Sequence, residues 1–292
     1  MKKINLITLP LLSIMLFGCS KSPVNEHPTK TSHSEEPSEE PSEESIEDIT
    51  EKEFRVLFIG NSFTYYNDLD QMTENLGKSL GLNITCDKVA TGSYHLYQYA
   101  DENNSYGQQV TEKLSNNQYS HVIIQEHSTS PVGDYNSFLS GATSLKAKIK
   151  QYQPNAEIRL YETWGFTSMA TNYKKTIIEC EEMLCEAYQK CGKELKLGVH
   201  YVGRAFSKAY TEQPSINLYY TDDKHPSFAG TYLSGLVHLA SITGVDIREV
   251  TYVGVEGTQN AWGETYITNE NATLLKNIAY SVYTQYGTSY NA

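Results

Sequence analysis

The sequence lacks the short motifs that identify several large classes of enzymes and metal-binding proteins. It has no G-x-G-x-x-G or phosphate-binding loop, no H-E-x-x-H motif and no G-x-S-x-G turn. Cysteine is scarce: there are 5, none at the C-x-x-C spacing of a structural zinc site. We therefore expect neither a metal nor a cofactor. An extracytoplasmic location would permit disulfides among Cys86, Cys180, Cys185 and Cys191, but the spacing does not define their pairing.

The apolar run at the amino terminus is too short to span a bilayer as a stable anchor. It covers residues 4–17 and follows Lys2 and Lys3, which is the order found in export signals. A small residue then precedes Cys19, as in a lipoprotein cleavage site, although an ordinary secretory signal with a chance cysteine is the alternative. We predict that residues 1–19 are a lipoprotein signal peptide and that the protein is lipid-anchored at a bacterial cell surface or envelope, outside the cytoplasm.

Residues 20–53 have the composition of a disordered tether. A Ser-Glu-Glu-Pro repeat over residues 34–44 contains no apolar side chain, so this part cannot offset the loss of backbone entropy on folding. The segment carries 11 acidic and 3 basic residues, a net charge of −8 out of the chain's −12. The remainder is therefore only mildly acidic, and nothing in it points to nucleic acid. An interaction tail is the alternative to a tether.

The rest of the chain, residues 54–292, has the length of one α/β domain. Apolar, β-branched runs alternate with helical patterns, which favours a parallel sheet covered by helices on both faces. The pattern predicts strands at 54–59, 83–90, 121–124, 157–161 and 195–199, and helices at 68–80, around 110–114, and at 135–151, 172–190, 227–243 and 269–286. We therefore predict a three-layer α/β fold.

Chemically useful residues follow several of the predicted strands. Gly60-Asn61-Ser62 comes directly after the first strand, Gly92 lies just after the second, and Gln125-Glu126-His127 follows the third. Because the carboxyl ends of parallel strands meet at one edge of a sheet, these residues are expected to converge on one cleft. Near the end of the domain, Asp222-x-x-His225 adds a carboxylate and an imidazole, the partners that a nucleophilic serine requires.

These blocks resemble those of the Ser-Gly-Asn-His (GDSL-like) hydrolase superfamily, a group of esterases and lipases with a flavodoxin-like fold. The resemblance covers residues 54 to about 243, with Gly60-Asn61-Ser62 in the place of the usual Gly-Asp-Ser. It implies that Ser62 is the nucleophile, that His225 is the base and that Asp222 orients the base. It also implies that the backbone amides of Ser62 and Gly92 bind the oxyanion.

The third block departs from the family pattern. Gln125-Glu126 stands where the family usually has Gly-x-Asn-Asp, which is more similar to a branch of acetylesterases acting on carbohydrate. A glutamine amide can donate to an oxyanion as asparagine does, so Gln125 is the expected third donor. The departure leaves this donor, rather than the nucleophile, in question.

Each site residue also has a simpler explanation. Ser62 could cap the following segment, His225 could lie on the surface, and Gly92 and Gln125 could serve only the turn and the strand end. Asp222 could be a helix cap, with Asp223 as the partner of the histidine; the three-residue separation favours Asp222. His95 and His127 lack a partnered motif, so we expect structural or substrate-lining roles for them.

Aromatic residues near the predicted cleft suggest the substrate. The chain contains 23 tyrosines, and Tyr65, Tyr66, Tyr94, Tyr97 and Tyr99 lie near the first two loops, while Trp164 follows the fourth strand. Aromatic faces suit sugar rings, so an O-acetylated carbohydrate is the leading substrate and another small ester the alternative. A lipid esterase or thioesterase of the same fold, and a non-catalytic glycan-binding lipoprotein, remain as other candidate functions.

Overall fold

Five parallel strands form the central sheet, in the order β2-β1-β3-β4-β5. The strands are β1 (Glu53–Gly60), β2 (Asn83–Ala90), β3 (His121–Ile124), β4 (Glu157–Glu162) and β5 (Gly198–Tyr201). The computed structural model describes residues 46–289. This strand order and the parallel pairing confirm the predicted flavodoxin-like α/β architecture.

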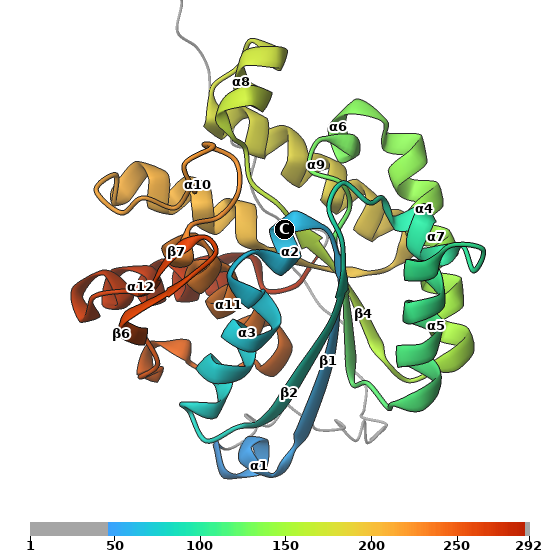
Figure 1. Cartoon of the computed structure of the whole chain (residues 1–292), viewed down its shortest axis with the longest axis horizontal. Coiled ribbons are helices and arrows are strands. Elements are labelled where there is room, and N and C mark those ends of the chain that lie inside the picture. The colour runs from blue at the N-terminus through green and yellow to red at the C-terminus, as the bar shows by residue number, and fades with distance from the viewer. Residues whose placement is uncertain (1–45, 290–292) are drawn as a thin grey trace, which may run out of the picture. The chain divides into compact units, whose positions relative to one another are not determined.

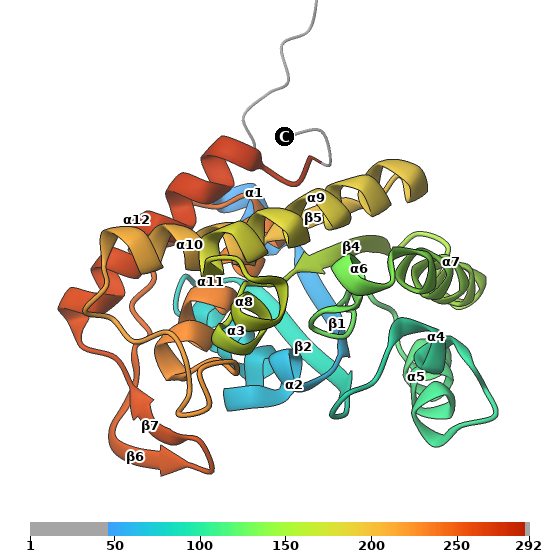
Figure 2. The ribbon, with the colours of Figure 1, turned by 90° about the horizontal axis from the view of Figure 1, so that it is seen from above.

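Helices cover both faces of the sheet, as Figures 1 and 2 show. On one face lie α3 (Leu69–Lys78), α11 (Phe228–Thr243) and α12 (Asn269–Tyr286), and on the other lie α5 (Ser105–Asn116), α7 (Tyr135–Tyr152) and α9 (Ile177–Leu195). The shorter helices are α1 (Ile46–Glu51), α2 (Ser62–Tyr65), α4 (Leu96–Ala100), α6 (Ser130–Gly133), α8 (Thr167–Tyr173) and α10 (Val202–Glu212), with 3-10 turns η1 (Tyr66–Asp68) and η2 (Ile247–Glu249). A separate antiparallel hairpin joins β6 (Gly254–Asn260) and β7 (Gly263–Tyr266).

Burial explains why the sequence pattern is so clear in two of these elements. Strand β1 lies inside the sheet with helices on both sides, and residues 56–60 are all buried. Helix α11 is buried along its whole length, and it is apolar all round rather than amphipathic. Its ends follow ordinary capping chemistry: Ser227 Oγ accepts from the Gly230 N–H at 3.1 Å, and Gly244 ends the helix at a φ of 74°.

Three parts of the fold differ from the prediction. Residues 195–197 do not start the fifth strand, because α9 runs on to Leu195 and Lys196 then ends it in the left-handed conformation. The predicted helix at 172–190 is two helices, α8 and α9, separated by a left-handed turn at Lys174. Helix α10 and the β6–β7 hairpin were not predicted; most hairpin residues are exposed, so they lack an apolar alternation.

The folded unit begins before the predicted boundary at residue 54. Helix α1 occupies residues 46–51, and Ile49 packs into the core with 8% of its surface exposed. The last residues of the predicted tether therefore belong to the fold, because Ile49 and the start of β1 add apolar contacts that the acidic repeat lacks. The predicted signal peptide, Cys19 and residues 20–45 lie outside the described residues.

Two further observations concern residues 46–289 alone. No helix there combines the length and the apolar character that crossing a bilayer requires. The four cysteines of this part, Cys86, Cys180, Cys185 and Cys191, are free thiols.

Candidate active site

Ser62 lies at the carboxyl end of β1, on the first residue of α2. The strand ends at Gly60, and Asn61 caps the short helix, with its side-chain oxygen facing the Phe63 N–H at 3.5 Å. A Cβ on Gly60 would come within 2.3 Å of Thr64 Oγ1 and 2.6 Å of Gln125 Oε1. Glycine at this position therefore leaves the space that Thr64 and Gln125 occupy beneath the nucleophile turn.

A tight loop before α11 carries Asp222 and His225. Tyr219 and Pro226 pair across its base, and the Tyr220 N–H donates to the His225 carbonyl at 2.7 Å. Asp223 turns the chain at the tip with a φ of 55°. This turn directs the side chains of Asp222 and His225 toward each other.

The loop brings the three predicted catalytic side chains into one hydrogen-bonded line. His225 Nε2 lies 2.8 Å from Ser62 Oγ, and His225 Nδ1 lies 2.5 Å from Asp222 Oδ2. The other carboxylate oxygen of Asp222 accepts the backbone N–H groups of Lys224 and His225 at 3.1 and 3.0 Å. Burial would raise the pKa of Asp222, but these hydrogen bonds outweigh it and lower the pKa. Asp222 is thus held as a carboxylate, and Asp223 does not take its place.

Aromatic rings fix the plane of the His225 imidazole. Tyr66 stacks on it with ring centres 4.2 Å apart and planes 6° apart, while Phe63 meets it edge-on at 5.7 Å. Burial and the negative charge of Asp222 raise the pKa of Tyr66, so this ring stays a neutral phenol. A neutral, flat surface holds the imidazole in line with the serine without competing for its proton.

Gln125 comes close to the nucleophile but faces away from the reaction. Its Oε1 accepts the Asn61 N–H at 2.8 Å and the Thr64 hydroxyl at 3.0 Å, and its Nε2 donates to Asn61 Oδ1 at 3.0 Å and to the Glu126 carbonyl. Both amide hydrogens are therefore used, and the residue is only 1% exposed. This geometry corrects the expectation that Gln125 donates to an oxyanion: here the side chain braces the turn that carries Ser62.

Gly92 lies at the same level of the sheet as Ser62. The last paired residues of β1 and β2 are Gly60 and Ala90, so Ser62 and Gly92 each follow their strand by two residues. Asn61 ties the two loops together, because its Nδ2 donates to the Tyr94 carbonyl at 3.1 Å. As the first amide of α2, Ser62 has no carbonyl one turn earlier within the helix. The backbone amides of Ser62 and Gly92 remain the candidates for binding an oxyanion.

His95 and His127 form a second cluster around buried Glu126. His95 Nδ1 lies 2.8 Å from Glu126 Oε1, and this hydrogen bond raises the pKa of His95. The His127 ring stacks on His95 at 4.8 Å, and burial and the charge of His95 lower the pKa of His127. Both imidazoles are partly exposed beside the nucleophile loop, as expected for residues that line a site rather than serve as its base.

The aromatic surface beside the histidine comes partly from a residue that the sequence did not single out. Trp262, at the turn of the β6–β7 hairpin, lies 4.9 Å from Tyr66 and 6.3 Å from Tyr65 between ring centres. Asn260 links this hairpin to η1 through a 3.1 Å hydrogen bond to Asn67. Trp262 thus extends the wall that Tyr65 and Tyr66 form next to His225.

Other aromatic residues expected at the site are part of the core. Trp164 is 1% exposed and stacks between Phe63 and Phe206, with ring centres 4.4 and 4.0 Å away. Tyr99 is fully buried and donates to the carbonyl of Gly60. The expectation that these two rings face a sugar is therefore wrong, because neighbouring side chains already cover both of their faces.

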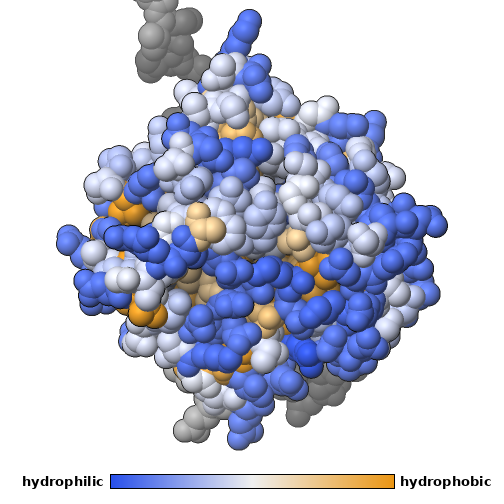
Figure 3. Space-filling model, viewed as in Figure 1, coloured by the Kyte–Doolittle hydropathy of each residue, from blue (hydrophilic) through white to orange (hydrophobic). Residues whose placement is uncertain are grey.

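The surface around the site has a mixed character. α2 and the β6–β7 hairpin lie on the viewer's side of the protein in Figure 1, as the turned view in Figure 2 confirms. On this face, drawn in Figure 3, hydrophobic residues form only small patches separated by hydrophilic ones. A cavity of about 400 Å³ adjoins the aromatic wall and is lined by Asn217, Tyr219, Tyr220, Thr221, Ser227, Trp262 and Gly263.

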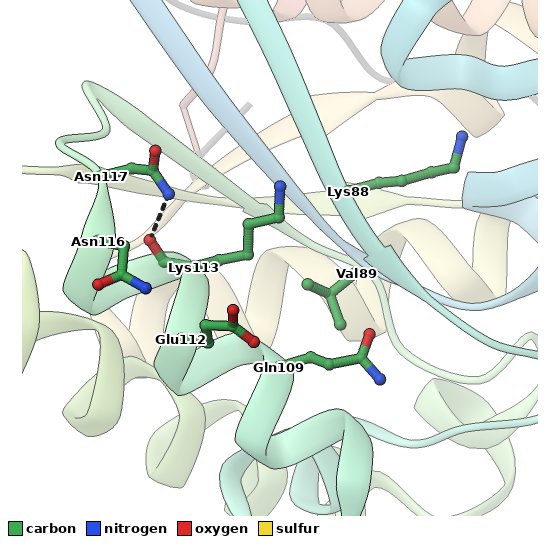
Figure 4. A pocket seen from close by; sticks show the side chains of 7 residues that line it. All are labelled: Lys88, Val89, Gln109, Glu112, Lys113, Asn116 and Asn117. Atoms are coloured by element: carbon green, nitrogen blue, oxygen red, sulfur yellow. Dashed lines mark hydrogen bonds between the residues drawn. The ribbon is translucent and has the colours of Figure 1, made fainter.

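Another hollow, of about 290 Å³, lies between β2 and α5 (Figure 4). Lys88 and Lys113 line it, but their ammonium groups already pair with carboxylates, Lys88 with Asp68 and Asp70 and Lys113 with Asp87. Neither lysine is therefore free to bind an anionic ligand, and none of the predicted catalytic residues lines this hollow.

In the described part of the chain, one group of side chains has donors close enough together to hold a metal ion. It consists of Glu162, Glu181 and Cys185, all fully buried. Arg204 already pairs with Glu181 at 3.1 Å, and the Gly203 N–H donates to Glu162 at 2.6 Å. The guanidinium of Arg204 already supplies a positive charge next to Glu181, so we assign this cluster to the core.

Comparison with solved structures finds proteins of similar fold. A DUF4886 family protein from Bacteroides uniformis superposes with a TM-score of 0.68 and 16% sequence identity, over 82% of this chain and 97% of its own. A protein from Slackia heliotrinireducens described as a candidate SGNH hydrolase gives a TM-score of 0.55 and 22% identity, over 66% of this chain and 100% of its own. No protein-family model and no curated protein matches the chain. The fold is that of the SGNH hydrolases.

Proposed function

We propose that this protein is a carboxylic ester hydrolase that works through a serine–histidine–aspartate triad. The observation that carries the proposal is the continuous contact from Asp222 through His225 to Ser62, with 2.8 Å between the imidazole nitrogen and the serine oxygen. This distance allows direct proton transfer. A fold shared with SGNH hydrolases agrees with the proposal but does not by itself define an activity.

The chemistry would proceed in two steps. His225 Nε2 takes the Ser62 proton as the serine oxygen attacks the ester carbonyl, and Asp222 holds the imidazole in the required tautomer and stabilises its positive form. The tetrahedral oxyanion would rest on the amides of Ser62 and Gly92, and its collapse, with a proton from His225, releases the alcohol. Water then attacks the acyl-enzyme with His225 again as base, which releases the acid and restores Ser62.

The proposed substrate is a short-acyl ester, acetyl above all, on a carbohydrate. Tyr65, Tyr66 and Trp262 present aromatic faces next to His225, and aromatic faces bind sugar rings well. The adjoining cavity of about 400 Å³ is lined by amide, hydroxyl and aromatic groups, which suit a polyhydroxylated ligand. A lipid esterase or thioesterase would need a broad apolar surface, and the face in Figure 3 has only small apolar patches.

The test of the activity combines labelling and turnover. A fluorophosphonate probe should label the wild type and leave Ser62→Ala unlabelled, and that variant should lose hydrolysis of 4-nitrophenyl acetate. Ser115→Ala, an exposed serine on α5, is the matched control and should behave as wild type. Equal turnover by purified Ser62→Ala would refute the proposal and favour a binding protein of the same fold.

The acyl preference needs a separate measurement. Rates on 4-nitrophenyl esters of two to twelve carbons should fall with length, and acetylated xylan should release acetate. A maximum at eight carbons or longer would move the assignment to a lipid esterase.

We also propose that the protein acts outside the cytoplasm, lipid-anchored through Cys19. The support is the short apolar run that ends in Leu-Phe-Gly-Cys. A fatty-acid probe should tag the wild type in cells and not Cys19→Ala. Equal tagging of both proteins, or of neither, would contradict the anchor.

A further inference from the structure

A lysine that forms no ion pair within residues 46–289 lies in the loop that carries His225. Lys224 stands between Asp223 and His225, and its backbone carbonyl accepts the indole N–H of Trp164 at 3.0 Å. Its ammonium lies 5.9 Å from the ring centre of Phe63, the residue after the nucleophile, and 5.3 Å from that of Phe166. The side chain therefore reaches over an aromatic floor next to Ser62.

The charge of Lys224 is incompletely compensated. Among residues 46–289, no carboxylate lies within 4 Å of its ammonium, whereas Lys88, Lys113 and Lys208 each contact an acidic side chain. Burial lowers the pKa of Lys224, and the charge of nearby Asp222 only partly opposes this effect. Asp222 is itself engaged by His225. A half-buried cation of this kind is stabilised when an anion arrives from solution.

His127 is another polar group of this part of the site, and its ring stacks on that of His95 at 4.8 Å. Burial, the charge of His95 and the charge of Lys224 lower the pKa of His127, so this imidazole stays neutral. The Glu126 carboxylate does not pair with the Lys224 ammonium in place of an incoming anion. It is 1% exposed, and its Oε1 contacts His95 at 2.8 Å. Lys224 thus offers a positive charge that no ion pair within residues 46–289 uses, in a chain with a net charge of −12.

We propose that Lys224 binds a carboxylate in the alcohol part of the ester, so that the substrate is an acylated sugar acid. This inference rests on the proposed hydrolase function. A single ammonium matches the single charge of a carboxylate better than the double charge of a phosphate. Because an acetyl group carries no charge, the anion must belong to the alcohol that leaves.

The experiment compares matched aryl esters that differ in charge. We would measure kcat/KM for 3- and 4-acetoxybenzoate against the neutral 3- and 4-acetoxybenzamide, since the two positions place the carboxylate at different distances from the scissile bond. The wild type should favour at least one benzoate over its amide. Lys224→Met should reduce this preference by roughly 10–100-fold, the range for a hydrogen bond to a charged group, mainly through KM.

Two further variants and a change of salt concentration test the same site. Lys224→Arg keeps the positive charge and should retain most of the preference, while Lys208→Met, on α10 and paired with Glu212, should leave the preference unchanged. For each variant, hydrolysis of the acetyl ester in the neutral acetoxybenzamides shows that the protein is folded. Raising the salt concentration should weaken the preference in the wild type more than in Lys224→Met, because salt screens the attraction between charges.

The outcomes separate this inference from the proposed function. Ser62-dependent hydrolysis of the neutral esters with no preference for the benzoates, or a preference that survives Lys224→Met, would overturn the carboxylate site and leave the hydrolase intact. Failure to hydrolyse any of the four esters would overturn the proposed function and, with it, the inference.

Discussion

Replacing Gln125 with alanine tests whether this residue braces the nucleophile turn or donates to the oxyanion. The side chain makes four hydrogen bonds at 1% exposure, and its removal leaves the Asn61 N–H and the Thr64 hydroxyl without their acceptor. At about 1 kcal/mol net for each bond, with partial relaxation, the free energy of unfolding should fall by about 2–4 kcal/mol. For a domain of this size the melting temperature should then fall by roughly 4–16 °C.

Activity should fall together with stability. A shift of the turn by about 1 Å would misplace Ser62 relative to His225 and cost on the order of 10²-fold in kcat. The assays are calorimetric unfolding and the kinetics of 4-nitrophenyl acetate hydrolysis on the same preparations. A brace predicts that both measurements change, whereas a donor that acts only in the transition state would change kcat alone.

Gln153 provides a matched control for this prediction. It is 2% exposed, accepts the Tyr119 N–H at 3.1 Å and donates to the carbonyls of Leu114 and Asn117, at the end of the sheet away from Ser62. Gln153→Ala should lower the melting temperature to a similar extent and leave kcat close to that of the wild type. A Gln125→Ala protein with wild-type stability, lowered kcat and unchanged KM would refute the bracing role and restore the oxyanion assignment.

Three further predictions follow from the described contacts. Asp222→Asn should lower kcat by roughly 10⁴-fold because an amide favours the wrong histidine tautomer, while Asp223→Asn stays near wild type; the reverse order in steady-state kinetics would show that the triad is misassigned. Burial and the nearby carboxyl group of Glu181 raise the pKa of Glu162, so its protonated form is the stable one in the fold. This contribution to the free energy of unfolding is complete below the unfolded-state pKa of about 4.3 and is lost as the pH rises through the folded-state pKa. Between pH 5 and 9 the melting temperature should therefore fall less in Glu162→Gln than in the wild type. Parallel curves of melting temperature against pH for the two proteins would show that Glu162 is not the cause. Deleting residues 20–45 should leave the melting temperature unchanged. A longer deletion that removes Ile49 should lower the free energy of unfolding, measured by chemical denaturation, by about 1.5–3 kcal/mol. Equal stability of the two truncated proteins would contradict the packing of α1.

The sequence by itself was sufficient for features that depend on local pattern. The buried run of β1 and its abrupt end at Gly60-Asn61-Ser62 predicted a strand followed by an exposed serine, because a fully buried strand must be apolar and Gly-Asn is typical of a turn. The alternation of strands and helices predicted a parallel sheet, and short-range spacing favoured Asp222 over Asp223. These features are encoded within a few residues of one another.

Tertiary structure alone decided which way side chains face and what covers them. Gln125 has the right chemistry for an oxyanion donor, but its Nε2 already donates to Asn61 Oδ1, more than sixty residues earlier in the chain, and to the carbonyl of Glu126. Trp164 and Trp262 are equally apolar in the sequence, yet Phe63 and Phe206 enclose the first, while the second stands beside Tyr66 on a hairpin with no clear periodicity. Burial and hydrogen-bond satisfaction are properties of contacts between distant segments, so a residue type and its neighbours in the chain cannot specify them.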